Sequence, residues 1–276
     1  MTLPRPRTAS GRAGLDALLT DPAGAVVGLD FDGTLSPIVD DPERARAHPG
    51  AVPALRRLLP SVRSVAVVTG RPAAVAAEYA GLVGTTGLDG LVVLGAYGAE
   101  RWDGATGEVA EPDPSPGVER ARQRLPGLLA DLGAPEGVWV EDKGRALGVH
   151  TRRAADPQGA LDALREPLAG LAARLGLRLE PGRYVIELRP PGMDKGAALA
   201  AYVRETGASV VLFAGDDVGD LPAFEAVEAL RHEGLAGLTV CSGSDEVTAL
   251  VERADLVVDG PDGVVALLDA LADALG

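Results

Sequence analysis

Short apolar runs and helix-like stretches alternate along the first hundred residues of the chain. The runs Ala25–Leu29, Ser64–Val68 and Leu91–Leu94 are almost wholly apolar and have the length of strands. Continuous runs of this kind are typical of strands buried on both faces of a parallel sheet. The stretches 52–59 and 72–79 favour helices, and each has a proline in its first turn, where a helix tolerates it. The pattern predicts a parallel sheet with helices on both faces.

The same alternation returns after residue 189. We expect helices at 195–205, 220–230, 245–252 and 264–275, and strands at 209–213, 238–240 and 255–258. Residues 1–12 are polar and rich in Arg and Pro, so we expect a loose tail there and a short helix at 14–19. Residues 1–111 and 189–276 are therefore predicted to form one α/β domain.

The middle of the chain has a different pattern. Three prolines within 111–117 predict a linker. Beyond it, strand patterns come in pairs between helical stretches. We expect helices at 118–132 and 157–175 and strands at 138–141, 146–150, 177–179 and 184–188, with turns at Lys143-Gly144 and Pro181-Gly182. Residues 112–188 are therefore predicted to form a small antiparallel α+β domain inserted into the first.

Composition narrows the class of protein. Hydrophobic residues make up 46% of the 276 residues and aromatics only 3%, so the core must consist mainly of Ala, Val and Leu. A net charge of −14 without a basic stripe argues against a nucleic-acid partner. The single cysteine, Cys241, excludes a disulfide within the chain. The apolar runs are too short to span a membrane, and residues 1–12 lack a signal-like core, so we expect a cytoplasmic protein without a membrane partner. We also expect a monomer.

A cluster of polar residues follows the first predicted strand. Asp30 and Asp32 stand at its carboxyl end, the edge of an open parallel sheet where ligands bind. Two carboxylates spaced by two residues share one side of an extended chain, and a divalent cation relieves their repulsion. Gly33 permits a sharp turn that brings backbone N–H groups toward an anion. A lone Asp-x-Asp is common, and a plain polar turn explains this segment as well.

Three further clusters lie at strand ends or helix starts. Each also has an ordinary structural explanation: a helix N-cap, a solvated lysine, or a turn in which Asp220 caps a helix. A hydroxyl at a helix start can bind phosphate, a lysine there indicates a negative partner, and grouped carboxylates suit Mg²⁺. Because all the clusters fall on one alternating fold, we interpret them as one active site. They are Thr69–Arg71, Asp194–Gly196 and Gly215–Asp220.

Together these four clusters resemble the motifs of the haloacid dehalogenase superfamily. That resemblance implies a Rossmann-like core and identifies the insert as a C2-type cap. Further segments resemble the trehalose-6-phosphate phosphatase family, and the resemblance covers about residues 25–270. These segments are Leu94–Glu100, Val140–Gly144, Val149–Arg152 and Gly182–Pro190.

The resemblance implies roles for the core residues. Asp30 is the nucleophile, and Asp32 is first the acid for the leaving sugar oxygen and then the base for water. Thr69 and Lys195 hold the phosphoryl oxygens, and Gly33, Gly70 and Arg71 are also expected to bind substrate. Mg²⁺ is expected on Asp30, the backbone carbonyl of Asp32, and Asp216. We expect Asp217 as an additional ligand of Mg²⁺, and Asp220 is the alternative that the sequence leaves open.

The resemblance also implies a sugar site in the cap. Glu141, Lys143, Arg183 and Glu187 match polar positions that hold the disaccharide in the family, and His150 and Arg152 are weaker candidates. Solvent-exposed strand faces would explain charges there equally well. Two segments depart from the family pattern, and the departures concern residues that support the metal ligands and some that contact the sugar. They are Gly219–Leu221, where Thr-Asp-Glu is usual, and Ala96–Gly98, where Asn-His-Gly is frequent.

The resulting hypothesis is hydrolysis of trehalose 6-phosphate through a phospho-aspartate, the last step of trehalose biosynthesis. One alternative is the same chemistry on another glycosyl phosphate, such as sucrose 6-phosphate or glucosyl-3-phosphoglycerate. A metal-dependent glycosyltransferase would also use an Asp-x-Asp segment, but it needs no Lys195 or Asp216 for phosphate release. An inactive phosphate-binding module is the third alternative, although every expected nucleophile and metal carboxylate is present.

Overall fold

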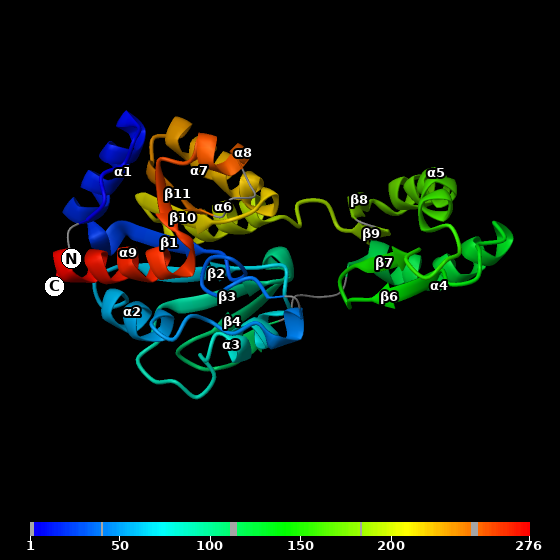
Figure 1. Cartoon of the computed structure of the whole chain (residues 1–276), viewed down its shortest axis with the longest axis horizontal. Helices are drawn as coiled ribbons and strands as arrows, with labels where there is room; N and C mark the ends of the chain where they lie inside the picture. Colours follow the sequence, from blue (N-terminus) through cyan, green and yellow to red (C-terminus); the bar gives the residue numbers. More distant parts are fainter. Residues whose placement is uncertain (1–2, 40, 111–114, 183, 244–247) are drawn as a thin grey trace. The chain divides into compact units, whose positions relative to one another are not determined.

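The chain forms two compact units in the computed structural model, which describes residues 3–39, 41–110, 115–182, 184–243 and 248–276. The core unit comprises Met1–Glu111 and Asp194–Gly276, and the second unit comprises Pro112–Met193 (Figure 1). The second unit therefore extends to Met193, slightly beyond the expected boundary at residue 188.

The core unit is built on an eight-stranded sheet in the order β12-β11-β10-β1-β2-β3-β4-β5. The pairs from β12 to β3 are parallel, as the apolar runs predict, and β4 and β5 add antiparallel at one edge. The strands are β1 (Ala25–Leu29), β2 (Ser64–Val68), β3 (Leu91–Gly95), β4 (Glu100–Asp103), β5 (Val109–Ala110), β10 (Val210–Gly215), β11 (Ala236–Gly243) and β12 (Leu256–Asp259).

Helices cover both faces of this sheet, which confirms the predicted α/β class. One face packs against α1 (Ala9–Thr20), α2 (Ala51–Leu58), α3 (Ala73–Tyr79) and α9 (Gly260–Leu275). The other packs against α6 (Lys195–Thr206), α7 (Leu221–His232) and α8 (Thr248–Arg253). Ala, Val and Leu dominate both buried clusters, as the composition requires. Short 3₁₀ turns join these elements: η1 (Pro22–Gly24), η2 (Pro42–Arg44), η3 (Ala96–Gly98) and η4 (Val218–Asp220).

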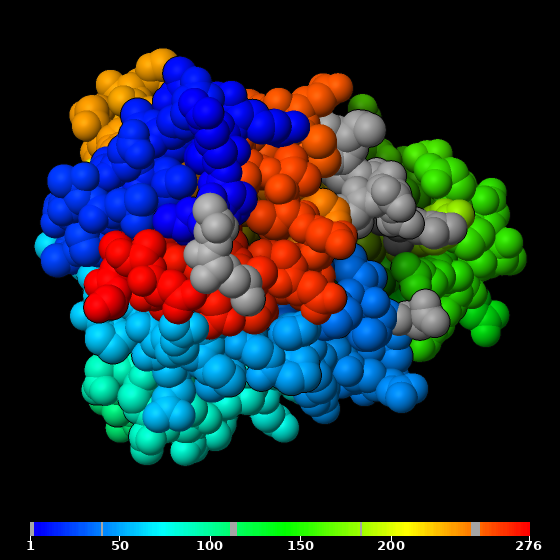
Figure 2. All heavy atoms as spheres, turned by 60° about the vertical axis from the view of Figure 1, so that its left-hand side comes forward, coloured from blue at the N-terminus to red at the C-terminus, as the bar shows by residue number. Residues whose placement is uncertain are grey.

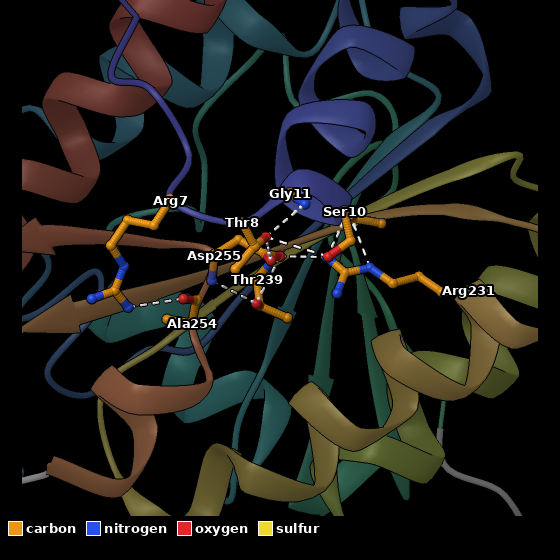
Figure 3. A network of polar contacts seen from close by, with 9 residues as sticks. Arg7, Thr8, Ser10, Gly11, Arg231, Thr239, Ala254 and Asp255 are labelled. Carbon is orange, nitrogen blue, oxygen red and sulfur yellow. Dashed lines mark hydrogen bonds and ion pairs between the residues drawn. The ribbon is translucent and has the colours of Figure 1, made fainter.

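The start of the chain is more ordered than the sequence predicts. Helix α1 begins at Ala9, not near residue 14, because the Thr8 hydroxyl caps it by accepting the N–H of Gly11 at 2.9 Å. The same hydroxyl donates to the buried carboxylate of Asp255 (Figure 3). The backbone N–H of Arg7 donates to the Asp255 carbonyl at 2.7 Å. Figure 2 shows the blue N-terminal part beside the red helix α9 on the surface of the core unit. The expected loose tail over residues 1–12 is therefore wrong for the residues from Arg7 onward.

The second unit is an antiparallel sheet with two helices on one face. The strand order is β6-β7-β9-β8, and the predicted hairpin with its turn at Lys143-Gly144 is confirmed. The second hairpin pairs β8 with β9 as expected, but its predicted turn at Pro181-Gly182 is wrong, because both residues lie in β8 and pair with Ile186 and Val185. Leu147, Val149 and Ile186 point into the core shared with the helices, and the alternate residues of each strand therefore face the other way. The elements are α4 (Pro116–Asp131), β6 (Trp139–Asp142), β7 (Leu147–His150), α5 (Pro157–Leu175), β8 (Arg178–Gly182) and β9 (Val185–Arg189).

Across both units, none of the helices in the described ranges is long and apolar enough to cross a membrane.

Candidate active site

The carboxyl ends of three neighbouring strands meet at one cavity. Asp30 follows β1, Thr69 follows β2 and Asp216 follows β10, and these strands are adjacent and parallel. Lys195 joins them from the first turn of α6. The cavity has a volume of about 380 Å³ and is lined by Asp30, Asp32, Ile38, Pro42, Thr69, Gly70, Arg71, Tyr97, Lys195, Asp216, Asp217 and Gly219. The structure thus brings together most of the core residues expected from the sequence.

Asp30 is a buried carboxylate beside a buried ammonium group. Its side chain is only 4% exposed, and Lys195 Nζ lies 2.7 Å from its Oδ1 and 2.7 Å from Asp220 Oδ1. Burial, followed by the charge of Asp220, raises the pKa of Asp30 well above its usual range. Burial alone would lower the pKa of Lys195, but Asp30 and Asp220 outweigh it and raise that pKa. Lys195 therefore stays charged and carries its charge into the cavity.

Asp30, Asp216 and Asp220 form a compact group of carboxylates. Their oxygens lie within 4.8 Å of one another. Burial, together with the charges of Asp220 and Asp217, raises the pKa of Asp216 to about 7. Lys195 supplies one positive charge to the three acids, so the group retains excess negative charge when ionised. Oxygen ligands in this number fit a divalent cation such as Mg²⁺.

Gly33 makes room for the carboxylate of Asp216. Its φ of +75° is a left-handed conformation, and a Cβ atom there would lie 1.9 Å from Asp216 Oδ2. A side chain at position 33 would therefore displace Asp216 from the cavity. The sequence predicted that Gly33 contacts the substrate. Its position in the structure also explains how the Asp216 carboxylate fits beside the turn.

Asp220, rather than Asp217, belongs to the buried acid group among the described residues. Its Oδ2 accepts the N–H groups of Asp216 at 2.9 Å and Asp217 at 3.2 Å. Asp217 is exposed and accepts the N–H of Gly219 at 2.8 Å in the cap of η4. Both acids thus shape the loop, but Asp220 also reaches Lys195. Sequence spacing left this choice open because it depends on side-chain direction.

Arg71 contacts Asp32 in the structure. Its Nε and Nη2 donate to the two oxygens of Asp32, each at 2.7 Å, in a bidentate pair. The guanidinium also lies 5.6 Å from the ring centre of Phe31 and 5.4 Å from that of Tyr79. The hydrogen bonds to Asp32 raise the pKa of Arg71. The sequence predicted substrate contact for Arg71 but not this pairing.

Tyr97 is a cavity residue that the sequence analysis did not select. Its N–H donates to the Thr69 carbonyl at 3.0 Å, and a Cβ at Gly70 would lie 2.8 Å from its hydroxyl. Ala96 and Tyr97 both have positive φ, 47° and 59°, a conformation that non-glycine residues rarely adopt. Such strain is common at functional sites. The sequence feature that could have indicated Tyr97 is the segment Ala96–Gly98, which departs from the family pattern.

The second unit gathers the expected sugar-binding residues on the sheet face opposite its helices. Lys143 forms an ion pair with Glu187 and lies 3.8 Å from Glu141. His150 Nε2 lies 2.7 Å from Glu141 Oε2. Arg152 is exposed, and Arg183 lies outside the described residues.

Most of the chain matches a known protein family. Residues 28–255 match the family model described as trehalose-phosphatase. The chain belongs to the trehalose-phosphatase family. A trehalose-phosphate phosphatase of Mycolicibacterium paratuberculosis is 34% identical over an alignment of 257 positions that covers 90% of this chain. The chain spans 62% of the length of that relative.

Solved structures show the same fold. A trehalose-6-phosphate phosphatase of Aspergillus fumigatus superposes with a TM-score of 0.74 at 22% identity, covering 98% of this chain and all of that one. A haloacid dehalogenase-like hydrolase of Bacteroides thetaiotaomicron superposes with a TM-score of 0.65 at 15% identity, over 89% and 98% of the two chains. These likenesses confirm the haloacid dehalogenase fold expected for the trehalose-phosphatase family.

Proposed function

We propose that this chain is a Mg²⁺-dependent phosphatase that hydrolyses trehalose 6-phosphate to trehalose and inorganic phosphate, the last step of trehalose biosynthesis. The observation that carries the proposal is the buried Asp30 carboxylate at the end of β1, with Lys195 at 2.7 Å and Asp216 beside it. Membership of the trehalose-phosphatase family supports the substrate.

Asp30 is proposed to act as the nucleophile. An oxygen of its carboxylate attacks phosphorus, and the bond between phosphorus and the sugar oxygen breaks as Asp32, protonated and released from its pair with Arg71, gives that oxygen a proton. Water then attacks the phospho-aspartate, Asp32 takes a proton from it, and inorganic phosphate leaves while Asp30 is regenerated. Lys195 and Thr69 line the same cavity and are proposed to hold the phosphoryl oxygens.

The acid group fits the expected cation. Asp30 and Asp216 would hold Mg²⁺ together with the backbone carbonyl of Asp32, and Asp220 supports the site through Lys195 and the loop N–H groups. Asp217, the auxiliary ligand named from the sequence, lies on the exposed side of this loop. When bound, the cation neutralises charge on the phosphoryl oxygens.

The sheet of the second unit is proposed to bind the sugar. Glu141 and Glu187 offer hydrogen-bond acceptors and Lys143 offers donors, which suits the hydroxyl groups of a disaccharide. Arg183 remains a predicted contact from the sequence alone. The monomeric state and the cytoplasmic location also stay predictions of the sequence.

The deciding experiment is a phosphate-release assay. Trehalose 6-phosphate, sucrose 6-phosphate, glucosyl-3-phosphoglycerate and glucose 6-phosphate are compared with and without Mg²⁺ after EDTA treatment. We expect strong, metal-dependent preference for trehalose 6-phosphate. Preference for another compound would keep the core chemistry and refute the proposed substrate. Silence on the whole panel would favour the inactive phosphate-binding module.

A further inference from the structure

An ordered stack of side chains stands beside Glu141 on the sheet of the second unit. Trp139 and His150 are cross-strand partners on β6 and β7. Their rings are parallel to within 10°, with centres 4.5 Å apart, and the guanidinium of Arg153 lies 4.5 Å from the Trp139 ring centre. Stacking of this kind holds the imidazole plane in one orientation.

Gly148 leaves the space that the imidazole occupies. It lies directly across from Glu141 on β6 and from Glu187 on β9. A Cβ at this position would lie 3.1 Å from His150 Nε2 and 3.5 Å from Val185 Cγ2. The missing side chain therefore lets the His150 ring lean back along β7 toward Glu141.

His150 uses that position to bind Glu141. The distance between His150 Nε2 and Glu141 Oε2 is 2.7 Å. An ionised carboxylate only accepts hydrogen bonds, so Nε2 must carry the hydrogen. Lys143 Nζ approaches the same Oε2 at 3.8 Å while it pairs with Glu187. Glu141 is thus held from two sides, although its own side chain is 46% exposed.

We propose that His150 is a positioning residue that fixes Glu141 to accept hydrogen bonds from the hydroxyls of the sugar. The inference rests on the proposed function, because it assumes a sugar phosphate as substrate. The His150 side chain is 20% exposed, less than half the exposure of Glu141, and its Nε2 is already engaged. These facts favour action through Glu141 over direct contact with the sugar.

The effect should appear in substrate binding. A glutamate side chain has several rotatable bonds, and fixing it before the sugar arrives removes an ordering cost from binding. The chemical groups on Asp30 and Asp32 belong to the core unit and are unchanged. Loss of His150 should therefore raise KM for the sugar phosphate and change kcat much less.

Four variants test this device. His150→Phe keeps a ring for the stack but has no N–H, whereas His150→Gln keeps an N–H donor but has no ring. Gly148→Ala leaves His150 in place and crowds its Nε2 at 3.1 Å. Gly127→Ala is the matched control, because Gly127 lies at an exposed position of α4 and the added methyl group meets nothing within 4 Å. Each variant is assayed with trehalose 6-phosphate and with p-nitrophenyl phosphate, which carries no sugar.

We expect His150→Phe and Gly148→Ala to raise KM for trehalose 6-phosphate about tenfold, as for loss of one hydrogen bond to a charged group. His150→Gln should recover part of this loss, Gly127→Ala should match the wild type, and the change with p-nitrophenyl phosphate should be much smaller. An unchanged KM in His150→Phe, or equal losses on both substrates, would overturn the inference. If the wild type prefers another sugar phosphate, the proposed substrate is wrong, and the same KM comparison on that compound still decides the role of His150.

Discussion

The core unit buries carboxylates in two places, and their surroundings push the pKa in opposite directions. The side chain of Asp255 is 2% exposed and that of Asp30 is 4% exposed. Burial raises the pKa of both, but at Asp255 hydrogen bonds from Thr8, Thr239 and Arg231 outweigh it and lower the pKa below the usual range (Figure 3). At Asp30, neighbouring acids add to burial, and Lys195 does not compensate for them.

The difference separates a structural acid from a chemical one. Asp255 accepts hydrogen bonds from groups that become ordered when the chain folds, so its charge favours the folded state. Asp30, Asp216 and Asp220 repel one another, and their ionised forms disfavour the folded state until a cation is bound. Strongly perturbed acids in a cavity are a mark of an active site, whereas burial alone is not.

Removing the nucleophile should have the largest effect on activity. Asp30→Asn is expected to reduce kcat with trehalose 6-phosphate by about 10⁴-fold or more. The fold should persist, because the variant removes one of the repelling charges. Stopped phosphate-release assays and thermal unfolding measure the two quantities. Turnover near the wild-type level would refute the phospho-aspartate mechanism.

Removing the structural acid should have the reverse profile. Asp255→Ala leaves Arg231 and Thr239 without their buried partner, so the free energy of unfolding should fall by about 3 kcal/mol. Urea unfolding at neutral pH measures this change. Folded Asp255→Ala protein should keep its kcat, since Asp255 does not line the cavity. A loss of kcat without a loss of stability would contradict the division between the two acids.

Mg²⁺ should stabilise the chain through the chemical acids. At a concentration about 100 times its Kd, a ligand that binds only the folded state adds about 2.7 kcal/mol of stability. EDTA-treated protein should therefore unfold at a higher temperature when Mg²⁺ is added. The shift should persist in Asp255→Ala and disappear in Asp216→Asn. A shift of equal size in both variants would place the cation elsewhere.

The smallest expected effect is the loss of stability at acid pH that is due to Asp255. The pKa of Asp255 is lower in the folded chain than in the unfolded chain, so the folded state binds fewer protons. Its contribution to stability is present above about pH 4, the unfolded pKa, and is lost as the pH falls toward the folded pKa. Asp255→Asn should show a shallower loss of stability below about pH 4 than the wild type in urea titrations. Parallel curves would show that Asp255 does not titrate differently in the two states.

The central strands were predictable because each is an apolar run buried on both faces. Strands β4 and β5 were not, because they lie at the sheet edge and only Trp102 of β4 is buried. The early start of α1 depends on the contact between Thr8 and Asp255, which are far apart in the sequence. Such contacts leave no local pattern to read.

The site divides in the same way. Asp30, Thr69 and Asp216 could be predicted because strand ends place them, whatever their side chains do. The pairing of Arg71 with Asp32, and the choice of Asp220 over Asp217, depend on side-chain directions that no spacing encodes. The contact between His150 and Glu141 could not be predicted either, because it depends on the space that Gly148 leaves for the imidazole ring.

The bond between Thr8 and Asp255 also determines where the chain can be shortened. The family match begins at residue 28, and a recombinant fragment cut there would retain Asp255 but lose the hydroxyl and the helix that cover it. Even a methyl group at Gly11 would collide with Asp255, because its carbon would lie 2.4 Å from the Asp255 Cβ. Fragments for crystallisation or display should therefore keep the residues from Arg7 onward, even though sequence comparison places them outside the family boundary.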